Sequence, residues 1–233
     1  MSNMVIDTLW DDNPIDVSTE VNFIWKIANK LRGTYQSDKY KDVIIPMVII
    51  RRFECALADT KKAVVDTFKK NPNYPAKAMY RISKKQFYNT SEFTLAELVN
   101  DSEHIAANFR NYISGFSANV QDIIKSLDFD KQIEKMDKNN RLLSVVKAFS
   151  ELDLNPVTID NVKMGYIFED LIRRFSENAE AGDHYTGRDI IKLMVNILLA
   201  EGCDDIFDDG KIITVLDLSL IHISEPTRQE AIS

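Results

Sequence analysis

Apolar residues recur at helical spacing along most of this chain, and that periodicity constrains the fold more than any other feature. The segment STEVNFIWKIANKLRG shows it well, because its apolar residues share one helix face and Gly33 provides a stop. Only seven glycines and six prolines occur among 233 residues, which argues against a loop-rich or all-β protein. The sequence therefore predicts an irregular arm over residues 1–17 and a helical domain over residues 18–155.

Local signals within the helical domain indicate where its helices begin and end. The apolar run over residues 43–50 contains Pro46, which predicts a buried, proline-interrupted helix followed by a second helix. Thr94 and Glu97 have the spacing of a capping box, and Ser117 precedes a later amphipathic run in a similar way.

The chain changes character after residue 155. Helices are predicted from about residue 159 to 176 and from about 187 to 200, and a polar turn then leads to an apolar run at 211–216. This run has the pattern of a buried strand, and many doubly wound α/β domains begin with a helix that leads into such a strand. We therefore predict a mainly α protein in which residues 156–217 form the truncated start of a Rossmann-like α/β domain.

Charge is distributed unevenly along the sequence. The net charge is −7, yet the segment 25–85 holds 15 Lys and Arg against five acids, a local net charge of +10. A basic block on an acidic protein indicates local contact with a phosphate-rich partner such as nucleic acid. A solvated helix face is the alternative explanation.

No sequence pattern indicates a metal centre, a redox pair, a nucleophile–base arrangement or a Gly-rich phosphate loop. Cys55 and Cys203 are far apart and are expected to be plain buried thiols, while His104 and His184 have no metal-ligand spacing. No apolar run approaches the roughly 18 residues of a membrane span, and no signal peptide is recognisable. A cytoplasmic protein with no membrane partner is expected.

The stretch AGDHYTGRDII, residues 181–191, has the clearest small-molecule signal. Thr186 is placed to cap a helix, with Asp189 completing a capping box and Tyr185 supplying an aromatic face. Arg188 lies in the first helical turn, where a cation opposes the helix dipole and requires a compensating anion. Such a helix start is suited to a carboxylate ligand, and an ordinary capped helix with a surface arginine is the alternative.

Three stretches, in order from about residue 20 to 217, together resemble the methyltransferase (modification) subunit of type I restriction–modification systems. They are FIWKIANKLRGTYQSDKYKDVIIPMVIIRRFECAL, MGYIFEDLIRRFSENAEAGDHYTGRDIIKLMVNIL and ITVLD. The resemblance implies a helical domain that contacts double-stranded DNA and a specificity subunit, in a complex that also contains a restriction subunit. It further implies a catalytic domain that uses S-adenosylmethionine to methylate the N6 amino group of an adenine flipped from the duplex.

The resemblance also implies roles for individual residues. The family's (Phe/Tyr)-Thr-Pro-Arg segment beside the cofactor corresponds to residues 185–188, with Gly187 replacing the proline that would preset φ. The expected cofactor-binding residues are Asp183, His184, Tyr185, Thr186, Gly187, Arg188 and, at the start of the family's Gly-rich loop, Asp217. The expected DNA-binding residues come instead from the basic block over residues 25–85 and are Arg51, Arg52, Lys84 and Lys85.

Nothing after Asp217 matches the family. The Gly-rich cofactor loop and the Asn-Pro-Pro-Phe motif are both missing, so this chain alone is expected to be inactive. Residues 218–228, LSLIHISEPTR, match in one reading frame a translation of adaptor DNA from transposase-based sequencing libraries. Residues 218–233 are thus predicted to be a non-native tail, and residues 203–233 to be poorly ordered. The alternative functions are a non-enzymatic helical DNA- or protein-binding module and a methyltransferase fused to its specificity domain.

Overall fold

The computed structural model describes residues 15–176, 190–191, 193–194 and 197. These residues are mainly α-helical, as predicted, and among them β-type pairing is limited to the isolated bridges Arg32–Tyr35 and Asn89–Phe116. The elements are α1 (Ser18–Ala28), η2 (Asn29–Leu31), η3 (Ser37–Lys39), α2 (Lys41–Leu57), α3 (Lys61–Lys70), α4 (Ala76–Ser83), α5 (Leu95–Leu98), α6 (Ile105–Ser114), α7 (Ala118–Ser126), α8 (Phe129–Lys138), α9 (Leu142–Ser150) and α10 (Asn161–Ser176).

The first helix forms as its apolar spacing predicts. Val21, Ile24 and Ile27 are buried along α1, and Leu31 extends that buried face through the short 3-10 helix η2. Gly33 follows with a φ of 85°, a left-handed conformation that glycine adopts more readily than residues with a Cβ. The predicted stop at Gly33 is therefore confirmed.

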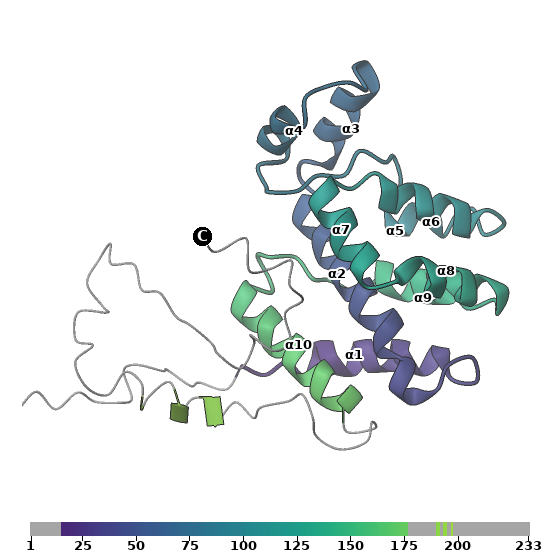
Figure 1. Cartoon of the computed structure of the whole chain (residues 1–233), viewed down its shortest axis with the longest axis vertical. Coiled ribbons are helices and arrows are strands. Elements are labelled where there is room, and N and C mark those ends of the chain that lie inside the picture. The colour runs from purple at the N-terminus through teal and green to yellow at the C-terminus, as the bar shows by residue number, and fades with distance from the viewer. Residues whose placement is uncertain (1–14, 177–189, 192, 195–196, 198–233) are drawn as a thin grey trace, which may run out of the picture. The chain divides into compact units, whose positions relative to one another are not determined.

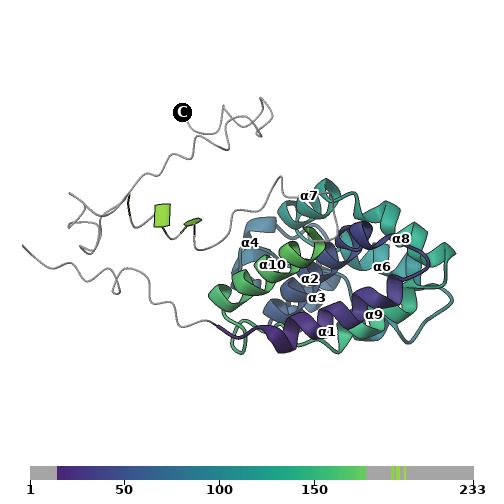
Figure 2. The same cartoon turned by 90° about the horizontal axis from the view of Figure 1, so that it is seen from below.

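α2 is the central helix of the described bundle, and it contacts η3, α8 and α9 (Figures 1 and 2). Pro46 lies inside it, so the buried helix predicted around this proline and its successor α3 are confirmed, and α2 continues through Pro46 without a break. The proline ring cannot donate to the carbonyl of Asp42, which costs one helical hydrogen bond. Complete burial of Ile44, Met47 and Ile50 offsets this loss, since each such side chain contributes about 1.5–3 kcal/mol.

Two groups of buried side chains hold the helices together. The main cluster contains residues of α1, α2 and all the helices from α5 through α10. Its Phe109 and Phe129 rings meet edge to face with centroids 6.1 Å apart. A smaller group stands apart from it and consists of Val64, Val65 and Met79, contributed by α3 and α4. The α3–α4 pair is thus a lobe with apolar packing of its own at one end of the bundle (Figure 1).

α10 packs against α1 within the same compact unit, Asn13–Tyr185. The Trp25 and Phe175 rings lie 5.5 Å apart, and Lys163 Nζ donates to Glu20 Oε1 at 2.7 Å. The domain boundary predicted between residues 155 and 156 therefore falls inside this unit.

The second unit holds the other described residues, 190–191, 193–194 and 197. They are helical, in agreement with the helix predicted from about residue 187 to 200. The predicted strand at 211–216, the tail at 218–233 and the predicted disorder over 203–233 lie outside the described residues.

The two predicted helix starts have different outcomes. At α5, Thr94 Oγ1 accepts from Glu97 N at 3.2 Å and Glu97 Oε2 accepts from Thr94 N at 2.7 Å, so the capping box is confirmed. Ser117 precedes α7 but makes no capping hydrogen bond, because its hydroxyl donates to Asn119 and accepts from Tyr88 N. The prediction of a side-chain cap at Ser117 is wrong, since partners outside the helix backbone use the hydroxyl.

Candidate functional site

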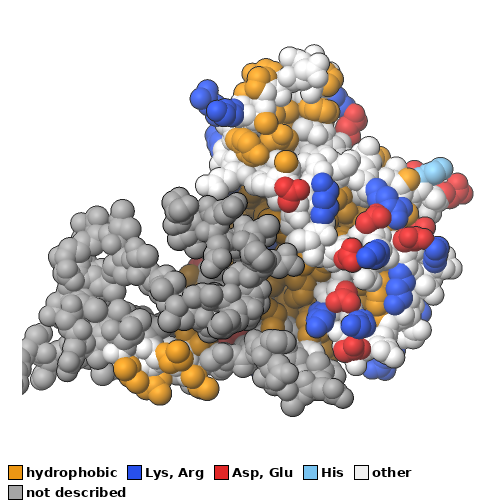
Figure 3. Space-filling model, viewed as in Figure 1, with side chains coloured by type: hydrophobic (Ala, Val, Ile, Leu, Met, Phe, Trp, Pro, Cys, Tyr) orange, Lys and Arg blue, Asp and Glu red, His pale blue; other side chains and the backbone are white. Residues whose placement is uncertain are grey.

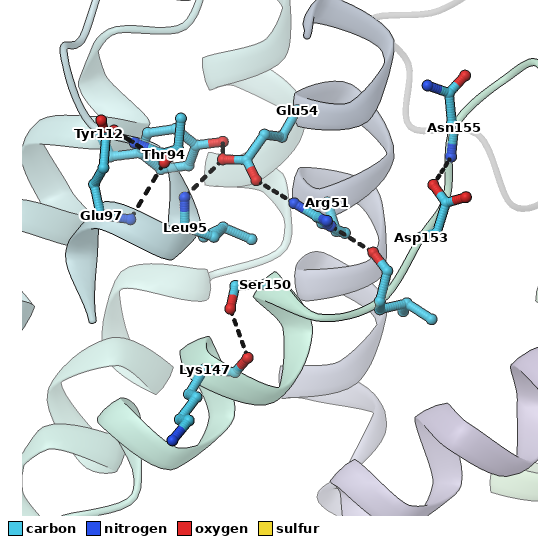
Figure 4. A network of polar contacts seen from close by, with 11 residues as sticks. Arg51, Glu54, Thr94, Leu95, Glu97, Tyr112, Lys147, Ser150, Asp153 and Asn155 are labelled. Carbon is cyan, nitrogen blue, oxygen red and sulfur yellow. Dashed lines mark hydrogen bonds and ion pairs between the residues drawn. The ribbon is translucent and has the colours of Figure 1, made fainter. Parts of the chain in front are cut away.

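Glu54 is the centre of a polar network on α2 (Figure 4). Its Oε1 accepts from Arg51 Nη1 at 2.5 Å, and its Oε2 accepts from Leu95 N at 2.7 Å and from Tyr112 Oη at 2.9 Å. Arg51 Nε donates in turn to the carbonyl of Leu152 at 2.6 Å. The Arg51 and Glu54 side chains are only 17% and 13% exposed. Both charges are therefore paired and hydrogen-bonded, the condition under which buried charges are tolerated.

The same network fixes the start of α5. Its first residue, Leu95, donates its backbone N–H to Glu54, and the capping box satisfies the N–H groups of Thr94 and Glu97. The first N–H groups of a helix have no intrahelical acceptor, so a carboxylate at this point also complements the helix dipole. Glu54 thus joins α2 to α5 and, through Tyr112, to α6.

Arg52 has a similar internal role on the adjoining side of α2. Its Nη1 donates to the carbonyls of Leu154 at 2.8 Å and Ile159 at 2.6 Å, and its Nη2 donates to Asn161 Oδ1 at 3.0 Å. Burial lowers the pKa of the guanidinium, yet an arginine stays protonated in proteins. The side chain therefore attaches the segment that leads into α10 to the central helix.

The four predicted DNA-binding residues do not form one surface. Arg51 and Arg52 point their guanidinium groups at internal acceptors, whereas Lys84 and Lys85 are exposed directly after α4. Lys84 has a φ of 53° in the left-handed region, which ends the helix.

The α3–α4 lobe, taken here as residues 61–85, is strongly basic. Asp66 is its one acidic residue. Its exposed cations are Lys62, Lys69, Lys70, Lys77, Arg81, Lys84 and Lys85, of which Lys69 pairs with Glu92 at 2.8 Å. Figure 3 shows Lys and Arg side chains gathered at an edge of this end of the bundle. An exposed, one-sign surface of this kind attracts a polyanion.

A cavity of about 450 Å³ lies beside the Glu54 network. Lys61 lines it, donating to Asn89 Oδ1 at 2.9 Å with its ammonium 5.6 Å from the Tyr112 ring centre. Burial lowers the pKa of Lys61 to about 8 despite the nearby Glu54, and burial raises the pKa of Tyr112 well above its ordinary value. Burial also raises the pKa of the Cys55 thiol, which is half-buried at this cavity rather than fully buried as predicted, and so disfavours its reactive thiolate form.

Nothing in the described residues resembles a metal centre, and His104 is an exposed side chain paired with Asp101. No helix in that part of the chain is both long and apolar enough to span a membrane. The predicted cofactor-binding residues, Asp183, His184, Tyr185, Thr186, Gly187, Arg188 and Asp217, lie outside the described residues, and so does Cys203.

The helical unit is a domain that occurs in other proteins. The chain belongs to the HsdM N-terminal domain family, whose model matches residues 21–149, more than half of the sequence and the stretch from α1 to α9. Among curated proteins it is similar to the "Type I restriction enzyme MjaIX methylase subunit" of Methanocaldococcus jannaschii, with 23% identity over 208 residues. This match covers 80% of the chain and 36% of the relative, so the chain spans about a third of that protein. The family recognised from the sequence is confirmed.

Sequence reasoning missed Glu54, Asn89 and Tyr112 as organising residues. The one local signal was the spacing of Arg51 and Glu54, three residues apart on a helix, which brings their side chains together. Asn89 and Tyr112 had no such signal, because Asn89 contacts Lys61 and Tyr112, which are 28 and 23 residues away, and Tyr112 contacts Glu54, which is 58 residues away.

Proposed function

We propose that this chain is the N-terminal part of an adenine-N6 DNA methyltransferase subunit of a type I restriction–modification system. In the full-length parent the methyl donor is S-adenosylmethionine, and the enzyme acts in the cytoplasm with a specificity subunit and a restriction subunit. The observation that carries the proposal is the HsdM N-terminal domain match across α1 to α9. The name of the archaeal relative, a methylase subunit, supports it.

Cofactor binding is assigned to the segment after α10. The sequence predicts that Tyr185, Thr186 and Arg188 supply an aromatic face, a helix cap and a cation at a helix start, a combination suited to the methionine carboxylate of the cofactor. Asp183, His184, Gly187 and Asp217 complete the proposed set by their correspondence to the family's motifs.

This assignment is tested with a chain in which the family's catalytic half follows Asp217. Calorimetry should detect S-adenosylmethionine binding, and Tyr185→Ala and Arg188→Ala should each weaken it about tenfold or more. His104→Ala is the control, because His104 is exposed and lies far from residues 183–188 in the sequence. It should leave binding unchanged. An extended chain that ignores the cofactor would refute the methyltransferase proposal.

That outcome would favour a second candidate, a non-enzymatic DNA- or protein-binding module. The observation in its favour is that α1 to α10 belong to one compact unit, in which a main core joins every α-helix except α3 and α4, without a catalytic arrangement among the described residues. Such a module needs no catalytic half.

DNA binding is assigned to the exposed lysines of the α3–α4 lobe. In the assembled complex, Lys84→Glu combined with Lys85→Glu should weaken DNA binding and flatten its dependence on salt concentration, since fewer counterions are released. Arg51 and Arg52 were predicted to share this role, but their internal hydrogen bonds make Lys84 and Lys85 the sharper test.

Lys131→Glu combined with Lys138→Glu is the matched control. Both lysines are exposed on α8, and each already pairs with a neighbouring acid, Asp128 or Glu134. The control should keep both the affinity and the salt slope. Equal losses from the two double variants would show that net charge, not the α3–α4 lobe, governs binding.

A further inference from the structure

A groove with an apolar floor and a basic rim lies between α1 and α9. These helices are in contact and lie side by side in Figure 2. The groove has a volume of about 310 Å³, and its floor is formed by Phe23 and Ile27 of α1 and Ala148 of α9. It is separate from the Lys61 cavity, with which it shares no lining residue.

The rim of the groove contains three exposed lysines: Lys26 on α1, Lys30 on η2 and Lys147 on α9. Within the described part of the chain, none of their ammonium groups makes an ion pair or a hydrogen bond. Lys131 and Lys138 on α8, by contrast, each pair with a nearby acid. Three unpaired cations around one groove leave a local positive charge that Glu151, also at the groove, cancels only in part.

Exposed apolar surface adjoins the basic rim. Leu143 is 37% exposed and lies one helical turn before Lys147, so both side chains lie on the same side of α9. Half-buried Phe23 lies opposite on α1. A surface that combines an apolar floor with an unpaired basic rim complements an amphipathic partner with a negative flank.

We infer that the groove between α1 and α9 is a docking site for an acidic amphipathic helix of a partner protein. A groove between two packed helices accepts the ridge of side chains of a third helix. Leucine-type side chains would cover Phe23 and Ile27, while carboxylates on the flanks would meet Lys26, Lys30 and Lys147. DNA fits less well, since a phosphate backbone cannot use an apolar floor and Glu151 repels it. The inference does not depend on methyltransferase activity.

The test uses the full chain and a fluorescent synthetic peptide helix with leucines at positions i, i+3 and i+7 and glutamates beside them. Fluorescence anisotropy should show saturable binding. Lys30→Glu combined with Lys147→Glu should raise the Kd about tenfold or more, since two attractive contacts become repulsive. The matched control, Lys62→Glu with Lys70→Glu on α3, makes the same change in net charge and should alter the Kd less than about twofold.

A second variant addresses the apolar floor without changing charge. Ser144→Tyr, at the groove on α9, places a bulky side chain in the peptide's path and should weaken binding at unchanged salt dependence. Circular dichroism would verify that each variant keeps its helix content.

Three outcomes would overturn the docking site. One is no saturable peptide binding up to about 1 mM. Another is equal weakening by the groove and α3 variants, which would mean non-specific attraction. The third is a DNA duplex that displaces the peptide and binds less tightly to the groove variant, which would make DNA the occupant.

Discussion

Two pairs of basic residues from the same stretch of sequence have opposite fates in the fold. Arg51 and Arg52 lie on the central helix α2 and donate to the carbonyls of Leu152, Leu154 and Ile159. Lys84 and Lys85 follow α4, at the edge of a lobe with its own small apolar group, and are exposed. Equal charge in the sequence therefore does not mean equal availability to a partner.

The chemistry of the two side chains accounts for part of this difference. A guanidinium has five N–H donors in a planar fork, so Arg52 satisfies two carbonyls and an amide at once. A lysine ammonium is more strongly hydrated and is usually kept at the surface. Substituting Arg51 or Arg52 should thus lower the free energy of unfolding. Reversing the charges of Lys84 and Lys85 should weaken only the binding of a partner.

The largest loss of stability is expected at Glu54, because it links the arginine side of α2 to two other helices. Glu54→Ala leaves the Arg51 charge, the Leu95 N–H and the Tyr112 hydroxyl without their common acceptor. We expect the free energy of unfolding, measured by urea denaturation, to fall by about 3 kcal/mol. Glu103→Ala, at an exposed position, should change it by less than about 0.5 kcal/mol. Equal small effects would show that the Glu54 network contributes little.

The next largest loss is expected at Arg52. Arg52→Ala should lower the free energy of unfolding by about 2 kcal/mol, since a charged donor is removed from three acceptors. Arg52→Lys should recover only part of this, because one ammonium cannot reproduce the guanidinium fork. Hydrogen exchange should also accelerate in the first turns of α10, which Arg52 attaches to α2. Wild-type exchange rates there in Arg52→Ala would contradict this attachment.

The sequence predicted the helices well and the links between them poorly. α1 and α2 have strong local signals, namely the helical spacing of apolar residues before Gly33 and the apolar run around Pro46, so their existence follows from neighbouring residues. Glu54 instead contacts residues 41 and 58 positions away, and no local pattern encodes that proximity. Ser117 shows a related limit, since its hydroxyl makes no capping bond but instead donates to the nearby Asn119 side chain and accepts from the distant Tyr88 N–H.

Lys61 is intermediate between the internally bonded arginines of α2 and the exposed lysines after α4. It is a basic residue of the α3–α4 lobe that is half-buried against Tyr112. Its pKa is lowered from 10.5 to about 8 by burial. Between those pH values the unfolded chain holds a proton that the folded chain has released. The free energy of unfolding should therefore rise with pH in this window, by up to about 1.4 kcal/mol per pH unit.

Lys61→Met removes this titration. The pH dependence that remains in the variant comes from the other titratable groups, so the variant is the control for them. The wild-type free energy of unfolding minus that of the variant should increase as the pH rises above about 8. Parallel curves for the two proteins would mean that the Lys61 ammonium is not desolvated in the fold.

The smallest effect on stability is expected for Lys84→Glu combined with Lys85→Glu. Both side chains are exposed, and substitutions at such positions usually change the free energy of unfolding by less than about 0.5 kcal/mol. Position 84 has a left-handed φ of 53°, and a glutamate at this position has a backbone strain similar to that of the native lysine. Urea denaturation should therefore give nearly the wild-type midpoint. A loss as large as that of Arg52→Ala would show that these lysines also have internal partners, and the contrast between the two basic pairs would fail.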